Sequence, residues 1–386
     1  MGFVDRPVDE GKNSGAVPPW LTIHFDRPSD SQDVKQGTLQ QYTLQPGDAA
    51  TVELALNVSD ISRVQDLNEG REKVEDVLVL RIHNGRDYFL PIRGTWLQSS
   101  LGRSIDKLRR IPEGGIRKLQ HQRPDRSSHN HGDEGVKWSA PREIFRLTEA
   151  IEELMERTVA EWGMRAENVK PPWDGTAWPF AAWITPEKQR ETLKYCVREA
   201  LDTDQSFNKL FPAETSSLQR LEAVSETLLA FLGSLEDGIV TEAQWTELEK
   251  GIVERGKSKP VSTEDECMQI LELLSQSPPH STLFSSIVFT LSRVADQIAP
   301  FDKGHAVPIG DGLSRSSKEE VRMQQRVHEA ARHWRRELDA AYAAVLALIM
   351  IRGPETPKEK ERKATELRKK HVVEKFLNSR WAEEES

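Results

Sequence analysis

The chain has 386 residues, a formal net charge of −9 and a sequence pI of about 5.7. Its hydrophobic fraction of 37% is typical of a globular protein with a sizeable core, and its length favours two domains. The acidic balance excludes a general electrostatic attraction to nucleic acid or anionic lipid, so we expect no nucleic-acid partner.

Membrane insertion and metal chemistry are also disfavoured. Residues 1–20 contain no signal-peptide core, and no apolar run reaches the roughly 18 residues that a bilayer requires. Cys196 and Cys267 form no C-x-x-C pair, which favours a reducing compartment over a disulfide framework or a zinc site. We expect a cytoplasmic protein without metal or cofactor that meets membranes only through partners.

The N-terminal part has the period of β-strands. Alternating or β-branched apolar runs, separated by turn sequences, occur at 20–25, 50–58, 76–82 and 87–94. Asn84 and Gly85 predict a hairpin, because both tolerate the positive φ that a type I′ turn demands. Short strands with no helices between them indicate an antiparallel β-sandwich over residues 1–111.

A linker is predicted at residues 112–139, which are rich in glycine, serine, histidine and charge. Such a segment buries too little apolar surface to offset the cost of ordering, so we expect it to be flexible. It contains His121, His129 and His131. Composition alone allows a metal site there, but no cysteine or second cluster accompanies the histidines, and a solvated linker is favoured.

From Pro141 the period becomes helical, with proline suited to the first position of a helix. Apolar residues then recur at spacings of three and four, as in helices that bury one face. An all-α domain is predicted over 140–381. Its helices are expected near 141–155, 188–201, 218–235, 281–300, 318–352 and 356–381, the fifth with a break allowed near Trp334.

One stretch carries a family resemblance. VEDVLVLRIHNGRDYFLPIRGTWLQSSLGRSI at 74–105 resembles the end of the ASH domain of type II inositol polyphosphate 5-phosphatases, the group that contains the Lowe-syndrome phosphatase. LQPGDAATVELALNV at 44–58 resembles the strand pair before it. The anchors are Glu75, Asp76, Leu78, Leu80, Gly85, Asp87, Tyr88, Phe89, Leu90, Gly94, Leu97 and Gly102. The resemblance implies an immunoglobulin-like sandwich.

The helical half resembles, in short blocks, the RhoGAP-like domain that follows in the same family. The blocks are APREIFRLTEAIEEL (140–154), REALDTD (198–204), ETLLAFLGSLEDGIV (226–240), HSTLFSSIVFTLSRVA (280–295), AVLALIMIRGP (344–354) and KKHVVEKFLNS (369–379). This resemblance implies a domain that docks GTPases of the Rho type.

An active RhoGAP domain needs an arginine finger, whose charge stabilises the phosphoryl-transfer transition state and contributes roughly 10³–10⁵ in rate. The matching loop contains no arginine and consists of Trp183, Ile184, Thr185, Pro186 and Glu187. Arg190 follows, but the pattern places it inside the next helix. A solvated or ion-paired helical residue is favoured there over a displaced finger.

Supporting positions are lost as well. The family's lysine and arginine are replaced by Leu229 and Gly233, two prolines by Glu236 and Gly238, and an asparagine by Ala340. Together with the missing finger, these departures predict a domain that is inactive in GTPase activation.

The magnesium-binding signatures of the 5-phosphatase active site are absent from the sequence. The family's sandwich begins with a strand before the segment that matches GFVDRP at 2–7. We therefore expect a sandwich without its first strand, with an unpaired edge. The chain is interpreted as the back half of a longer phosphatase, or as a truncated or split gene product.

The resemblance implies partners. The ASH domain is expected to bind Rab GTPases, with Tyr88, Phe89 and Trp96 as candidate contacts, although aromatics of this kind also pack within sheets. The helical domain is expected to bind Rho or Rac GTPases, with Arg190 as a candidate contact, and short helical adaptor peptides. The function that follows is recruitment of phosphoinositide phosphatase activity to endosomal and Golgi membranes.

Two alternatives stay open. One is an active GTPase-activating protein, which requires Arg190 or another arginine to reach the nucleotide. The other is a structural extension of a phosphatidylinositol-bisphosphate 5-phosphatase that binds nothing itself.

Overall fold

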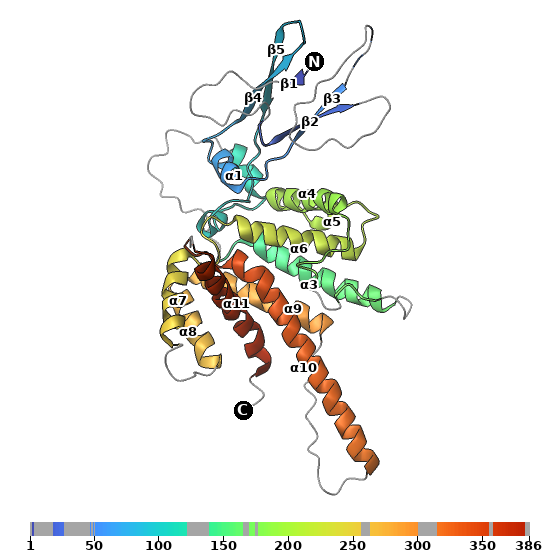
Figure 1. Ribbon diagram of the computed structural model, residues 1–386, viewed down its shortest axis with the longest axis vertical. Coiled ribbons are helices and arrows are strands. Elements are labelled where there is room, and N and C mark those ends of the chain that lie inside the picture. The colour runs from blue at the N-terminus through green and yellow to red at the C-terminus, as the bar shows by residue number, and fades with distance from the viewer. Residues whose placement is uncertain are drawn as a thin grey trace. The chain divides into compact units, whose positions relative to one another are not determined.

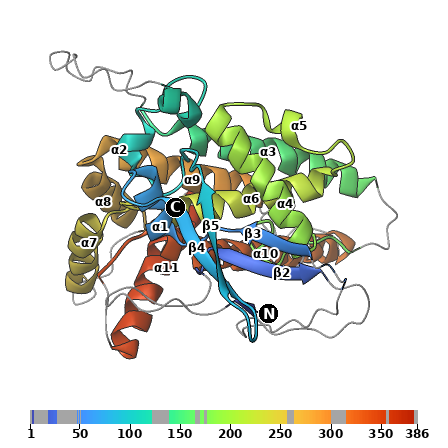
Figure 2. The ribbon, with the colours of Figure 1, turned by 90° about the horizontal axis from the view of Figure 1, so that it is seen from above.

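The computed structural model describes residues 2–3, 18–26, 47, 49, 51–121, 139–164, 170–173, 177–255, 263–299, 315–354 and 358–382. The chain divides into two compact units, Met1–Leu101 and Gly102–Ser386. The first contains the strands and the second is all-helical (Figures 1 and 2). The predicted order of an antiparallel β domain followed by an all-α domain is confirmed.

Two antiparallel sheets make up the N-terminal unit. One has the order β1-β4-β5 and the other pairs β2 with β3. The strands are β1 (Gly2–Phe3), β2 (Leu21–Asp26), β3 (Thr51–Leu56), β4 (Val74–Arg81) and β5 (Asp87–Gly94). The last four fall within the predicted apolar runs or begin or end within two residues of them, because alternation of apolar and polar residues marks a half-buried strand.

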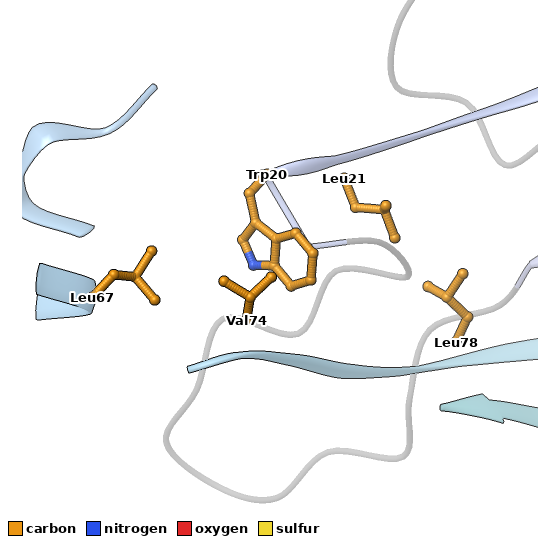
Figure 3. Packing of buried hydrophobic residues seen from close by; sticks show 5 residues of the cluster. All are labelled: Trp20, Leu21, Leu67, Val74 and Leu78. Carbon is orange, nitrogen blue, oxygen red and sulfur yellow. The ribbon is translucent and has the colours of Figure 1, made fainter. Parts of the chain in front are cut away.

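The two sheets share a small core (Figure 3). Trp20, which directly precedes β2, and Leu21 of β2 pack against Val74 and Leu78 of β4, and Leu67 closes one side. All five side chains are at most 7% exposed. This cluster holds the two sheets against each other and is the packing that a sandwich requires.

Two details of the sandwich prediction are wrong. A helix, α1 (Ile61–Asn68), lies between β3 and β4, with Asp60 accepting a hydrogen bond from Ser62 N as its N-cap and with Leu67 buried. The hairpin turn is not type I′, because only Asn84 has a positive φ, 57°, and Gly85 N donates to Ile82 O.

The helical unit is built around α6 (Ser217–Ser234), which packs against α3 (Arg142–Gly163), α4 (Glu187–Thr203) and α10 (Arg315–Met350). A capping box between Ser216 and Gln219 starts α6. The other elements are α2 (Ile105–Leu108), η1 (Ile116–His121), α5 (Phe207–Leu210), α7 (Glu242–Arg255), α8 (Thr263–Ser275), α9 (Pro278–Ile298), α10 (Arg315–Met350) and α11 (Glu359–Ala382). The break allowed near Trp334 does not occur, since α10 is continuous through it.

Residues 102–121 belong to the helical unit. Gly102 N donates to Ser234 Oγ at 3.1 Å, Gly114 N donates to Asp204 Oδ2 at 2.9 Å, and the Ile116 side chain is buried. The sequence assigned this stretch to the end of the sandwich and the start of the linker. Residues 122–138, which include His129 and His131, lie outside the described residues.

Candidate functional site

The finger loop, residues 183–187, is anchored by a single carboxylate on α6. Glu222 is fully buried and accepts hydrogen bonds from the Trp178 indole and from the backbone amides of Ile184 and Thr185, each at 2.8 Å. A buried carboxylate needs such donors, because it has given up its hydration. Glu222 therefore fixes the backbone of the loop against α6.

Arg190 lies in the first turn of α4 and is held within its own domain. Its Nε donates to Glu226 Oε2 at 2.8 Å, and its Nη1 donates to the Thr185 carbonyl at 2.6 Å. The guanidinium also stacks 4.5 Å from the centre of the Trp183 ring. Its side chain is 11% exposed. The arginine nearest the loop thus closes the loop against α6.

A second cation shares the same carboxylate. Lys194 Nζ donates to Glu226 Oε1 at 2.6 Å and to Glu191 Oε1 at 2.6 Å, and its side chain is 7% exposed. Partial burial by itself raises the pKa of Glu226, but the hydrogen bonds from Lys194 and Arg190 outweigh it and lower that pKa below its ordinary value. Arg190, Lys194 and Glu191 on α4 and Glu226 on α6 form one network that links the two helices.

The exposed surface beside this network is mixed in character. Ile184 is 54% exposed and Tyr195 on α4 is 70% exposed. Lys188 and Thr192 are exposed between them, spaced to lie on the same face of the helix. Neither the described residues of the finger loop nor this exposed face includes an arginine. The surface therefore offers contacts to a partner without a projecting guanidinium.

The supporting positions serve packing within the domain. Leu229 and Ala340 are half-buried. The Gly233 carbonyl accepts a hydrogen bond from Arg352 Nη2 at 2.9 Å, and the same nitrogen donates to the Leu235 carbonyl at 2.8 Å. The C-terminal end of α6 is therefore closed by an arginine from the segment after α10.

A second candidate surface is the β4–β5 hairpin. β5 pairs with β4 on one side, and on the described residues its other edge has no strand partner. Phe89 is 65% exposed and Tyr88 is 41% exposed. Phe89 lies opposite Val79 and Tyr88 lies opposite Leu80, so the two aromatics project from opposite faces of the strand.

Within the described residues, no three histidine, cysteine, aspartate or glutamate side chains gather as metal ligands. No helix in that part of the chain is long and apolar enough to cross a membrane.

Comparison with known proteins bears on the N-terminal unit. Residues 12–96 match the family described as inositol polyphosphate 5-phosphatase OCRL-like, ASH domain. The N-terminal unit carries an OCRL-like ASH domain. The chain is also 40% identical over 106 residues to the type II inositol 1,4,5-trisphosphate 5-phosphatase of Mus musculus. That alignment covers 28% of this chain and 9% of the mouse protein.

A comparison with solved structures also gives a partial match. The crystal structure of human Rho GTPase activating protein 15 aligns with a TM-score of 0.41 and 10% sequence identity. The alignment covers 75% of this chain and 93% of the human one.

Within the ASH domain, the Trp96 side chain is held by hydrogen bonding inside the domain. It is half-buried, and its Nε1 donates to Asn68 Oδ1 at 3.0 Å. Asn68 also accepts from Ser99 N and donates through Nδ2 to the Leu101 carbonyl. The structure therefore places Tyr88 and Phe89 on the exposed hairpin and separates Trp96 from them.

Sequence reasoning missed Glu222, Glu226 and Asn68. Glu222 and Glu226 carry a signal, because both fall near the apolar stripe of α6, where a carboxylate demands a partner. The partners of each carboxylate lie more than thirty positions away in the sequence. No local sequence pattern therefore predicts which residues they are.

Proposed function

We propose that this chain is a non-catalytic interaction module that binds small GTPases of the Rab and Rho types. In this role it recruits phosphoinositide phosphatase activity to endosomal and Golgi membranes, and it is cytoplasmic and peripheral to them. One observation carries the non-catalytic part: Arg190 is committed to Glu226, Thr185 and Trp183 inside its own domain.

The energetic argument concerns what a finger must do. A GTPase-activating protein accelerates hydrolysis only through contacts that strengthen in the transition state. An arginine that reaches the phosphates would have to give up two hydrogen bonds and its stacking on Trp183. A surface formed by Ile184, Lys188 and Tyr195 can still bind a partner. Binding without acceleration is the expected result.

The ASH domain supports the binding half of the proposal. An edge strand with exposed apolar side chains is suited to pairing with a strand of a partner. β5 offers such an edge, with Phe89 and Leu90 exposed beside it. We assign this edge to a GTPase of the Rab type, because the domain is OCRL-like.

Recruitment of a phosphatase rests on the relative from mouse, whose name states a 5-phosphatase activity. Two modest contacts on one chain reinforce each other through effective concentration. A module with one site on each unit would hold attached phosphatase activity at membranes where both GTPases are present.

The test uses the full chain and a panel of Rab and Rho-family GTPases in GDP and GTP-analogue states, with hydrolysis followed in the same samples. We expect nucleotide-dependent binding and unchanged hydrolysis. Acceleration that disappears in Arg190→Ala would establish an enzyme instead. A well-folded sample that binds none of the panel would favour the structural-extension alternative.

A further inference from the structure

A groove of about 650 Å³ runs between α3 and α9 of the helical unit. Phe145 on α3 and Phe289 on α9 both line it and are 40% and 42% exposed. The buried side chains of Met155 and Val294 also line it. Exposed aromatics of this size, beside buried apolar side chains, mark a surface that a partner can cover.

The groove is acidic. Its α3 side carries four glutamates on one face of the helix: Glu149, Glu152, Glu153 and Glu156. The basic residue among its lining residues is Arg293, which pairs with Glu152 at 3.2 Å. Like charges four positions apart destabilise a helix, and Glu149 with Glu153 and Glu152 with Glu156 are two such pairs. One glutamate of each pair is already compensated, Glu153 by Arg157 at 2.9 Å and Glu152 by Arg293. A cationic partner would add compensation at Glu149 and Glu156.

The N-terminal half of α10 has the complementary character. Met323 and Val327 are 65% and 64% exposed. With Ala330 and Trp334 they form a stripe spaced four, three and four, which follows one side of a helix. Arg322 and Arg326 immediately precede the first two apolar positions and flank that stripe. Figure 1 shows this half of α10 running clear of the other helices of its unit.

The two surfaces match in length and chemistry. The groove spans residues 145–156 of α3 and 286–297 of α9, and the stripe spans 323–334. Each of the three segments rises by about 16 Å at 1.5 Å per residue. Methionine makes favourable contacts with aromatic rings, and the arginines are opposite in charge to the glutamates.

The helix does not occupy the groove of its own chain. Phe145 and Met323 both stay exposed, as expected of two surfaces that do not cover each other. α10 continues without a break into Leu338 and Tyr342, which are buried in the core. Folding the first half back would therefore break the helix.

We propose that two copies of this chain associate through these surfaces, the N-terminal half of α10 in one copy seating in the α3–α9 groove of the other. Each chain offers one helix and one groove. A two-fold dimer makes the contact twice and leaves neither surface open. This inference is independent of GTPase binding.

The test is the mass of the full chain by sedimentation equilibrium between about 1 and about 100 μM, the range in which a modest interface associates. The wild-type mass is expected to rise from the 43.8 kDa of one chain toward twice that value. Glu149→Arg with Glu156→Arg, and separately Arg322→Glu with Arg326→Glu, should each weaken association by about tenfold or more.

Rescue distinguishes docking from a loss of folding. An equimolar mixture of the two charge-reversed proteins should regain the mass of a dimer, because each contact again joins opposite charges. The matched control is Arg362→Glu with Lys363→Glu, two exposed side chains of α11, which makes the same charge change as Arg322→Glu with Arg326→Glu and should leave association unchanged.

Three outcomes would overturn the proposal: a wild-type chain that stays monomeric, association that ignores both reversals, or a mixture that fails to recover. A monomeric chain that instead sediments with anionic lipid vesicles, and stops doing so in Arg322→Glu with Arg326→Glu, would reassign α10 to a membrane surface.

Discussion

Arg190 donates from Nε to Oε2 of Glu226 across 2.8 Å, and this contact joins the first turn of α4 to the middle of α6. The same carboxylate receives Lys194 on its other oxygen. A residue that one would test as a catalytic finger is therefore part of the packing between two helices. Its removal should be felt in stability.

We expect Arg190→Ala to destabilise the helical unit by about 1–3 kcal/mol, because it leaves Glu226 with one cation fewer in a half-buried site. GTP hydrolysis by a bound GTPase should not change. Urea unfolding of the full chain and single-turnover hydrolysis measure the two effects. Arg157→Ala, which breaks an exposed pair with Glu153, is the control and should stay within about 0.5 kcal/mol.

Glu222 should matter more than any residue of the finger loop itself. In Glu222→Gln the amide oxygen can still accept hydrogen bonds, but the amide N–H₂ replaces the other carboxylate oxygen and faces a donor. We expect the free energy of unfolding to fall by about 2 kcal/mol. Glu222→Ala leaves all three donors without acceptors and should cost about twice as much. Amide exchange at Ile184 and Thr185 should become faster in both variants. Unchanged exchange would contradict the anchoring role.

The β-strands and the long helices could be predicted because their periods are local. Alternation marks β2 to β5, and stripes at spacings of three and four mark α6 and α9 to within three residues. The short helix α1 was missed although Asp60 supplies its N-cap. Its pattern contains only two buried apolar positions one turn apart, too few to distinguish a helix from a turn.

The site could be predicted only in part. The absence of an arginine from 183–187 is a property of the sequence, and so is the helical position of Arg190. That this guanidinium bonds Glu226 depends on how α4 packs on α6, which no local pattern encodes. The sequence makes Trp96 and Phe89 equal aromatic candidates, since only the fold separates an exposed ring from one hydrogen-bonded to Asn68.

Glu143 gives the helical unit a dependence on pH. Burial raises the pKa of Glu143 to about 7 from the ordinary 4.5, the charge of Asp202 adds to the rise, and Arg142 opposes it. The folded-state pKa is thus above the unfolded-state value. The contribution of Glu143 to the free energy of unfolding is fully present below the unfolded-state pKa. It is lost as pH rises through the folded-state pKa, by roughly 3 kcal/mol in total.

We therefore expect Glu143→Gln to remove this fall and to raise the free energy of unfolding at about pH 8. Urea midpoints between about pH 5 and about pH 8 measure it. Glu153→Gln on the exposed side of the same helix is the control and should keep the wild-type pH dependence. Equal pH profiles for the wild type and Glu143→Gln would assign the dependence to another group.

Substitutions of Phe89 and Trp96 should have opposite effects: the first should weaken GTPase binding, and the second should lower the stability of the ASH domain. Phe89→Ser removes a 65% exposed ring from β5, so binding of a Rab-type GTPase should weaken by about tenfold with a stability change within about 0.5 kcal/mol. Trp96→Phe removes the hydrogen bond to Asn68 and should destabilise the domain by about 1 kcal/mol with affinity unchanged. Leu56→Ser on β3, also exposed, is the control for affinity. A reversed pattern, with affinity lost at Trp96 and kept at Phe89, would move the interface away from the β5 edge.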